Sequence, residues 1–66
     1  MAIARVTKIT SSSSKSFQDA VESGLSRAAT TLRNITGLDI VSQKAKVEGG
    51  KITEYRTTME VTFVLD

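Results

Sequence analysis

Side chains that could do chemistry are few in this chain of 66 residues, which contains no Cys and no His. Without them there is no Ser–His or Cys–His nucleophile pair, disulfides are excluded, and a zinc-type metal site is not expected. Seven carboxylates are present, but no spacing brings two of them together for acid–base catalysis. Glu54 and Glu60 would share one face of a strand, yet they would lie roughly 20 Å apart at the rise of a strand. The sequence therefore predicts no catalytic residues and a protein that is not an enzyme.

Arg56 is the charged residue with two clear interpretations. It is either an exposed strand residue paired with neighbouring carboxylates, or a fork of hydrogen-bond donors aimed at an anion or a planar ligand. The sequence alone favours the first interpretation. Tyr55 is interpreted as a core aromatic and not as a proton donor. The "EGG" segment is expected to close a hairpin and does not open a helix, so this segment is not a phosphate-binding loop.

The elements that would position these residues follow from the hydrophobic pattern. Residues 2–10 are β-branched and partly alternating, which predicts a strand. Residues 15–34 carry apolar side chains at steps of three and four, which predicts a helix. Residues 38–47 and 51–66 alternate in polarity around a glycine pair, which predicts a hairpin of two further strands.

The serine-rich segment before the helix has two interpretations. Low-complexity serine forms flexible linkers, whereas a serine hydroxyl also caps a helix by accepting a free backbone N–H. We favour a cap, supplied by Ser13 or Ser14, with Ser16 and Asp19 as a second, acidic cap-like pair. Within the helix, Gly24 falls on the apolar stripe, where we expect it to allow a close approach to the sheet.

The element order β-α-β-β constrains the topology. The helical crossover returns the second strand parallel to the first, and the hairpin makes the third antiparallel to the second. If the third strand lies between the other two, all neighbours are antiparallel and the order is 1-3-2. We therefore predict the α+β class, one domain over residues 1–66, and one sheet face packed on the helix. The opposite face, which nothing in the chain is left to cover, would carry Glu54, Arg56, Thr58, Glu60 and Thr62.

Self-association is the expected way for so small a chain to add buried surface. A domain of this size buries only about 60% of its unfolded surface, and small scaffolds compensate with disulfides, a metal or oligomerisation. No apolar run approaches 18 residues and no secretory signal is visible, so we expect a cytoplasmic protein without membrane contact. The net charge of +2 is spread along the chain, and one Tyr and two Phe offer little stacking surface, which argues against a nucleic-acid partner.

The segments "SFQDAVESGLSRAATTLRNI" and "LDIVSQKAKVEGGKITEYRTTMEVTFVLD" resemble the dodecin family, and the resemblance covers nearly the whole chain. It implies a three-stranded sheet wrapped on one helix and twelve copies assembled as a hollow homododecamer. It also implies pairs of flavins, such as riboflavin or FMN, held between subunits for storage or sequestration.

The resemblance also assigns positions to the ligand site. Flavin-binding members place a Trp just after the helix, where its ring stacks on the flavin, and a Gln after the Tyr-like residue of the last strand. Gly37 and Arg56 occupy these positions here. We interpret Gly37 both as the turn residue that ends the helix and as an emptied stacking position.

The two replacements lead to an expectation about the ligand. Loss of a stacking ring removes roughly 1–3 kcal/mol per ring, so we expect flavin binding to be weak or absent. Arg56 would make the pocket favour anions. Lys44 lies near the region where some family members use a basic residue for the flavin phosphate, and it would assist Arg56.

Two alternatives stay open. The first is a structural or carrier shell with no organic ligand, whose carboxylates collect cations such as calcium or magnesium at symmetry axes. The second is a small nucleic-acid-binding module, which only the slightly basic balance of charge supports. No individual residue is predicted as a metal ligand.

Overall fold

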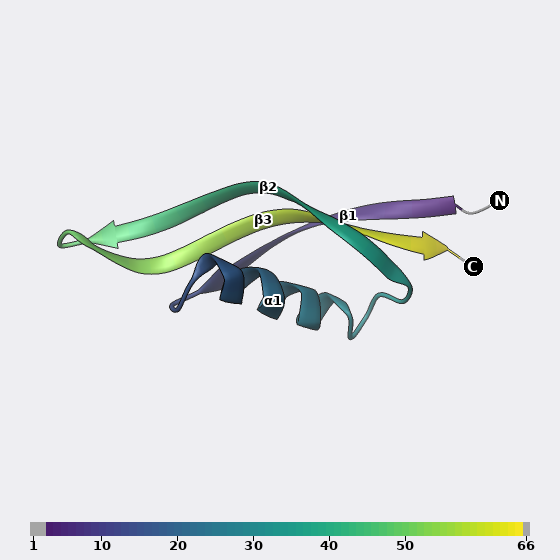
Figure 1. Ribbon diagram of the computed structural model, residues 1–66, viewed down its shortest axis with the longest axis horizontal. Helices are drawn as coiled ribbons and strands as arrows, with labels where there is room; N and C mark the ends of the chain where they lie inside the picture. Colours follow the sequence, from purple (N-terminus) through teal and green to yellow (C-terminus); the bar gives the residue numbers. More distant parts are fainter. Residues whose placement is uncertain (1–2, 66) are drawn as a thin grey trace.

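The computed structural model describes residues 3–65, which form three strands and one helix: β1 (Ile3–Ser13), α1 (Phe17–Ala28), β2 (Ile35–Glu48) and β3 (Lys51–Leu65). Strand β3 lies between β1 and β2 and runs antiparallel to both. The predicted α+β class and the strand order 1-3-2 are therefore confirmed. Figure 1 shows α1 on one side of the sheet and the β2–β3 hairpin extending beyond the helix. The first position of the predicted first strand, residue 2, and the last position of the predicted third strand, residue 66, lie outside the described residues.

The helix begins at a serine cap, as expected, although at the second of the predicted positions. Ser16 has extended backbone geometry, and its Oγ accepts a hydrogen bond from the Asp19 backbone N–H at 2.9 Å. Ser13, the last residue of β1, donates its hydroxyl to the Asp19 carboxylate, with 2.6 Å between the two oxygens. The prediction that Ser13 or Ser14 is the cap is therefore wrong, because the serine run first extends β1 and Ser13 anchors the acidic residue of the first turn.

The regular helix ends at Ala28, six residues before the predicted end. Thr30 Oγ1 donates to the Arg27 carbonyl at 2.7 Å, and Thr31 Oγ1 donates to the Ala28 carbonyl at 3.3 Å. Short hydroxyl side chains of this kind compete with the backbone for the last carbonyls of a helix. Apolar residues continue at steps of three and four as far as Ile35, but the α-helix does not continue with them.

Asn34, and not Gly37, turns the chain from helix to strand. Asn34 has a φ of 61°, in the left-handed region that Asn adopts more readily than most residues. The glycines with positive φ are Gly49 and Gly50, which close the hairpin. Gly37 lies inside β2, which begins at Ile35. The interpretation of Gly37 as the turn residue that ends the helix is therefore wrong.

The core lies between α1 and the β1–β3 part of the sheet. The helix contributes only small buried residues, and one of them, Gly24, lies so close to the sheet that an added Cβ would be 2.7 Å from Met59 Cε and 2.9 Å from Ser11 Cβ. The expected close approach at Gly24 is confirmed. At the start of the helix, Phe17 and Tyr55 pack edge to face with ring centroids 5.0 Å apart, so the Tyr55 ring borders the core on the helix side, although the residue is only half-buried. The buried residues are Ala20, Gly24, Ala28, Thr57, Met59 and Val61.

The subunit is elongated and incompletely covered. The described residues measure 52 × 19 × 13 Å, with a Cα radius of gyration of 13.6 Å, against about 11 Å for a compact domain of this length. Helix α1 packs on β1 and β3, and β2 contains no buried residue. Large apolar side chains remain exposed at both ends of the molecule and along β2: Ile3, Val6, Ile40, Val41, Val47, Ile52 and Leu65. This exposure agrees with the expectation that copies of the chain associate.

Candidate functional site

The sheet face turned away from α1, which we call the outer face, carries the charged residues in rows. Thr57, Met59 and Val61 are buried under the helix, so the alternate residues of β3 point to the outer face. The cross-strand register then places three successive rows from β1 through β3 to β2. We call them the basic, hydroxyl and acidic rows, and they are Ser12–Arg56–Lys44, Thr10–Thr58–Ser42 and Lys8–Glu60–Asp39.

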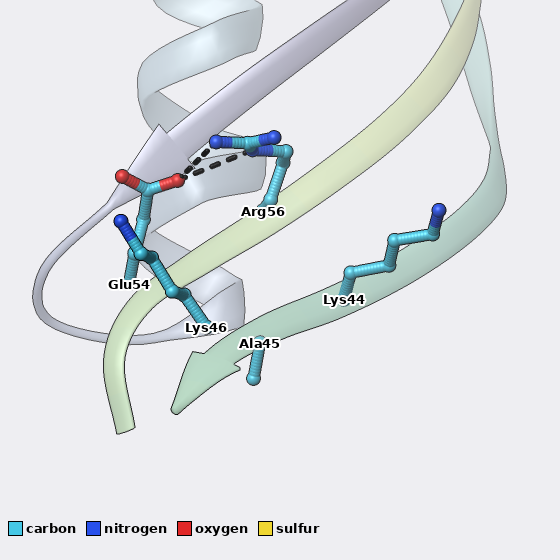
Figure 2. A pocket seen from close by; sticks show the side chains of 5 residues that line it. All are labelled: Lys44, Ala45, Lys46, Glu54 and Arg56. Carbon is cyan, nitrogen blue, oxygen red and sulfur yellow. Dashed lines mark hydrogen bonds and ion pairs between the residues drawn. The ribbon is translucent and has the colours of Figure 1, made fainter. Parts of the chain in front are cut away.

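The basic row borders a groove near the hairpin (Figure 2). This basic groove encloses about 390 Å³ and is lined by Lys44, Ala45, Lys46, Glu54 and Arg56. Arg56 directs its Nη2 and Nε toward Glu54 Oε1, at 2.6 and 3.2 Å. In the single chain, Arg56 is thus an exposed residue paired with a carboxylate. Its partner is the neighbouring Glu on the same strand face instead of a residue on another strand. Since both side chains are solvated, this pair contributes only about 0–1 kcal/mol.

The groove has an excess of positive charge. Three cationic side chains and one carboxylate line it, and Lys44 lies directly opposite Arg56 in the β2–β3 register. Like charges in directly opposed positions destabilise a sheet. No carboxylate among residues 3–65 forms an ion pair with Lys44, whereas Lys46 pairs with Glu48 at 3.7 Å. A groove of this kind suits a ligand that carries an anionic group.

Gly37 lies on the outer face but far from the groove in the same chain. It is opposite Thr62, six residues along β3 from Arg56, which corresponds to roughly 20 Å at the rise of a strand. A Cβ added at Gly37 would meet no atom within 4 Å, and its φ is an ordinary one. The structure therefore brings Lys44 and Arg56 together and leaves Gly37 apart. One pocket could contain all three positions only if two copies of the chain formed it.

A second pair of like charges escaped the sequence analysis. Asp39 lies directly opposite Glu60, because a β-bulge at Val41 shifts the β2–β3 register by one residue. An uninterrupted ladder from Lys44 and Arg56 would have placed Ile40 there instead. Nothing in the polar and apolar pattern signals such a bulge, so only the register of the folded sheet reveals the acidic row. Within residues 3–65 there is no group of three or more potential metal-ligating side chains.

These features define a class of protein: a small β-α-β-β subunit whose uncovered sheet face carries a charged, solvent-open groove. The chain belongs to the dodecin family, because the family model named Dodecin matches residues 3–66. Dodecin homologues form homo-oligomers and bind small molecules. A search of curated proteins finds no match, and no helix within residues 3–65 has the length and apolar character needed to cross a membrane.

Solved structures agree with the family assignment. A dodecin from Streptomyces davaonensis is 32% identical, with a TM-score of 0.93, and the match covers 98% of this chain and 96% of that one. A point variant of the dodecin from T. thermophilus gives a TM-score of 0.95 at 21% identity, over 100% and 98% of the two chains. A calcium dodecin from Mycobacterium tuberculosis, described as having a calcium-binding site, gives a TM-score of 0.83 at 28% identity, over 97% and 91%.

Proposed function

We propose that this protein is a non-enzymatic, flavoprotein-like binding and storage protein that works as a homododecamer of single-domain subunits spanning residues 1–66. The observation that carries the proposal is the basic groove on a sheet face that the chain itself leaves uncovered. Family membership supports small-molecule binding and self-association. The absence of His and Cys from the sequence, together with the lack of converging acid–base pairs in the groove, supports a role without catalysis.

The ligand that we propose is a flavin-type molecule or another small molecule with an anionic group. Lys44 and Arg56 would hold the anionic group, because the two residues are directly opposed on neighbouring strands and line the same groove, where only one carboxylate offsets three cations. Riboflavin itself should bind weakly, because Gly37 offers no ring on which the flavin can stack. FMN should bind more tightly than riboflavin, because its phosphate reaches charges that riboflavin cannot use.

The test is a titration of riboflavin and FMN into flavin-free protein, followed by quenching of flavin fluorescence. We expect FMN to bind more tightly than riboflavin, and the variant Lys44→Ala with Arg56→Ala to lose this preference. The matched control Lys15→Ala with Arg33→Ala removes two exposed cations outside the groove and should keep it. Sub-micromolar binding of riboflavin by the unaltered protein would refute the weakened flavin site.

A second candidate function is a cation-binding shell. It rests on the opposed carboxylates of Asp39 and Glu60 and on the similarity to the calcium dodecin from Mycobacterium tuberculosis. Copies of the two carboxylates around a symmetry axis would give the oxygen-rich ligand set that calcium prefers. Calorimetric titration with calcium tests it, and the variant Asp39→Asn with Glu60→Gln should abolish any binding that is found.

Two further expectations stay predictions. The first is that the protein is cytoplasmic, which fractionation of the cells that produce it would test. The second is that the protein has no nucleic-acid partner. If the protein bound DNA with an affinity that fell steeply as the salt concentration rose, this prediction would be contradicted.

A further inference from the structure

Glu54, the carboxylate that lines the basic groove, has two cationic side chains within reach. Its Oε1 accepts hydrogen bonds from Arg56 Nη2 and Nε, at 2.6 and 3.2 Å. In the β2–β3 register, however, Glu54 lies directly opposite Lys46, and in the view of Figure 2 the two cations lie on opposite sides of the Glu54 carboxylate. Lys46 pairs instead with Glu48, at 3.7 Å. Glu54 therefore has a second cationic partner that it does not use in the single chain.

The pair between Arg56 and Glu54 occupies donors that an anionic ligand would need. Nη2 and Nε form one edge of the guanidinium, and this fork is the part of Arg that matches the oxygens of a carboxylate or phosphate. While Glu54 accepts from both donors, an anion that approaches Lys44 cannot use the same edge of Arg56. A ligand that is to be held by both cations must therefore displace Glu54.

We propose that Glu54 competes with the ligand for Arg56 and moves to Lys46 when the anionic group of the ligand binds. This inference rests on the proposed function, because it concerns the same groove. The exchange leaves no carboxylate of the groove without a cation: Arg56 passes from Glu54 to the ligand, and Glu54 passes to the opposite ammonium. Lys46 gives up its pair with Glu48 at little cost, since both side chains are more than 60% exposed.

The exchange gives the groove a preference for anionic over neutral ligands. A hydrogen bond between a guanidinium and a carboxylate or phosphate is charge-assisted at both ends and frequently bidentate, which a neutral carbonyl or hydroxyl cannot match. An anionic group can replace Glu54 on equal terms and also reach Lys44, which forms no ion pair within residues 3–65. The ligands selected are therefore small molecules that carry a phosphate or carboxylate group.

The size of the effect follows from the strength of an exposed ion pair. The side chains of Arg56 and Glu54 are 56% and 34% exposed, so water screens their charges. Pairs of this kind are closed only about one to five times as often as they are open. Because apparent affinity is reduced by the fraction of the protein in which Arg56 is free, removal of the Glu54 charge should tighten anion binding about 2- to 6-fold.

The experiment is a titration of FMN and riboflavin, by quenching of flavin fluorescence, into protein shown by light scattering to keep its assembly. We expect Glu54→Gln to bind FMN about 2- to 6-fold more tightly than the unaltered protein, and riboflavin, which has no anionic group to exchange, to gain less. The matched control Glu22→Gln removes an exposed carboxylate of α1 outside the groove and should leave both affinities unchanged. FMN binding that is not tightened in Glu54→Gln, or an equal gain for both flavins, would overturn the competition.

The move of Glu54 to Lys46 is tested by a double-mutant cycle. Lys46→Gln removes the attraction between Lys46 and the FMN phosphate whether residue 54 is Glu or Gln, but only with Glu54 present does it also leave a displaced carboxylate without a cation. We therefore expect Lys46→Gln to weaken FMN binding by a larger factor in the unaltered protein than in Glu54→Gln. Equal factors in the two backgrounds would overturn the transfer to Lys46.

The variant Lys44→Ala with Arg56→Ala separates this inference from the proposed function. If this variant keeps the preference for FMN over riboflavin, the basic groove is not the ligand site, and both the proposed function and the exchange fail. If it loses the preference while Glu54→Gln binds FMN no more tightly than the unaltered protein, the proposed function stands and the exchange alone fails.

Discussion

Replacing Gly37 by Trp is the most direct perturbation of the proposed ligand site. The structure accepts the change, because an added Cβ meets no atom within 4 Å and the backbone is in a strand with an ordinary φ. Trp is also favoured in strands where Gly is disfavoured. The fold should therefore be kept, and any change in ligand binding can be assigned to the new ring.

The expected gain follows from the stacking energy. An aromatic ring stacked on a planar base contributes roughly 1–3 kcal/mol, and each 1.4 kcal/mol corresponds to a factor of ten in affinity. We therefore expect Gly37→Trp to bind riboflavin about 5- to 150-fold more tightly than the unaltered protein. Gly37→Phe, with a smaller ring, should give an intermediate gain.

The assay is the riboflavin titration with fluorescence quenching, on protein first shown by light scattering to keep its assembly. The matched control is Ser26→Trp, which adds the same ring at an exposed position on α1, away from the outer face. Riboflavin affinity should be unchanged in this control. If Gly37→Trp is folded and assembled but gains no affinity, position 37 does not line the ligand site.

Three predictions concern the stability of the subunit. Thr57→Val should raise the free energy of unfolding by about 1–2 kcal/mol, because the fully buried Thr57 Oγ1 has no hydrogen-bond partner among residues 3–65; urea unfolding measures this, and a loss of stability would show that the hydroxyl is satisfied in solution. Gly24→Ala should lower it by about 1–3 kcal/mol despite the better helix propensity of Ala, because the new methyl group would clash with Met59 and Ser11; an increase in melting temperature would contradict this. Ser16→Ala should lower the free energy of unfolding by about 0.5–2 kcal/mol, because the Asp19 backbone N–H loses its hydrogen-bond acceptor. Ser16→Asn should restore most of this stability, and equal melting temperatures for the unaltered protein and both variants would show that the cap does not contribute.

Much of the fold was predictable because it depends on local patterns. The alternation in β3 separated the residues under α1, such as Met59 and Val61, from those on the outer face, such as Arg56. Gly24 on the apolar stripe predicted a tight contact between helix and sheet. The order of elements predicted the central position of β3, because only that position makes all neighbouring strands antiparallel.

The amino-acid sequence by itself determined the order of the elements, the face of β3 that lies under the helix, and the absence of His and Cys from any site. Only the tertiary structure decided where the helix ends, that Asn34 makes the turn assigned to Gly37, and which charges meet across the strands. The physical reason is that cross-strand register depends on hydrogen bonds between distant segments, and a single bulge at Val41 changes it without altering the local pattern. The opposition of Lys44 to Arg56 and of Asp39 to Glu60 follows from that register.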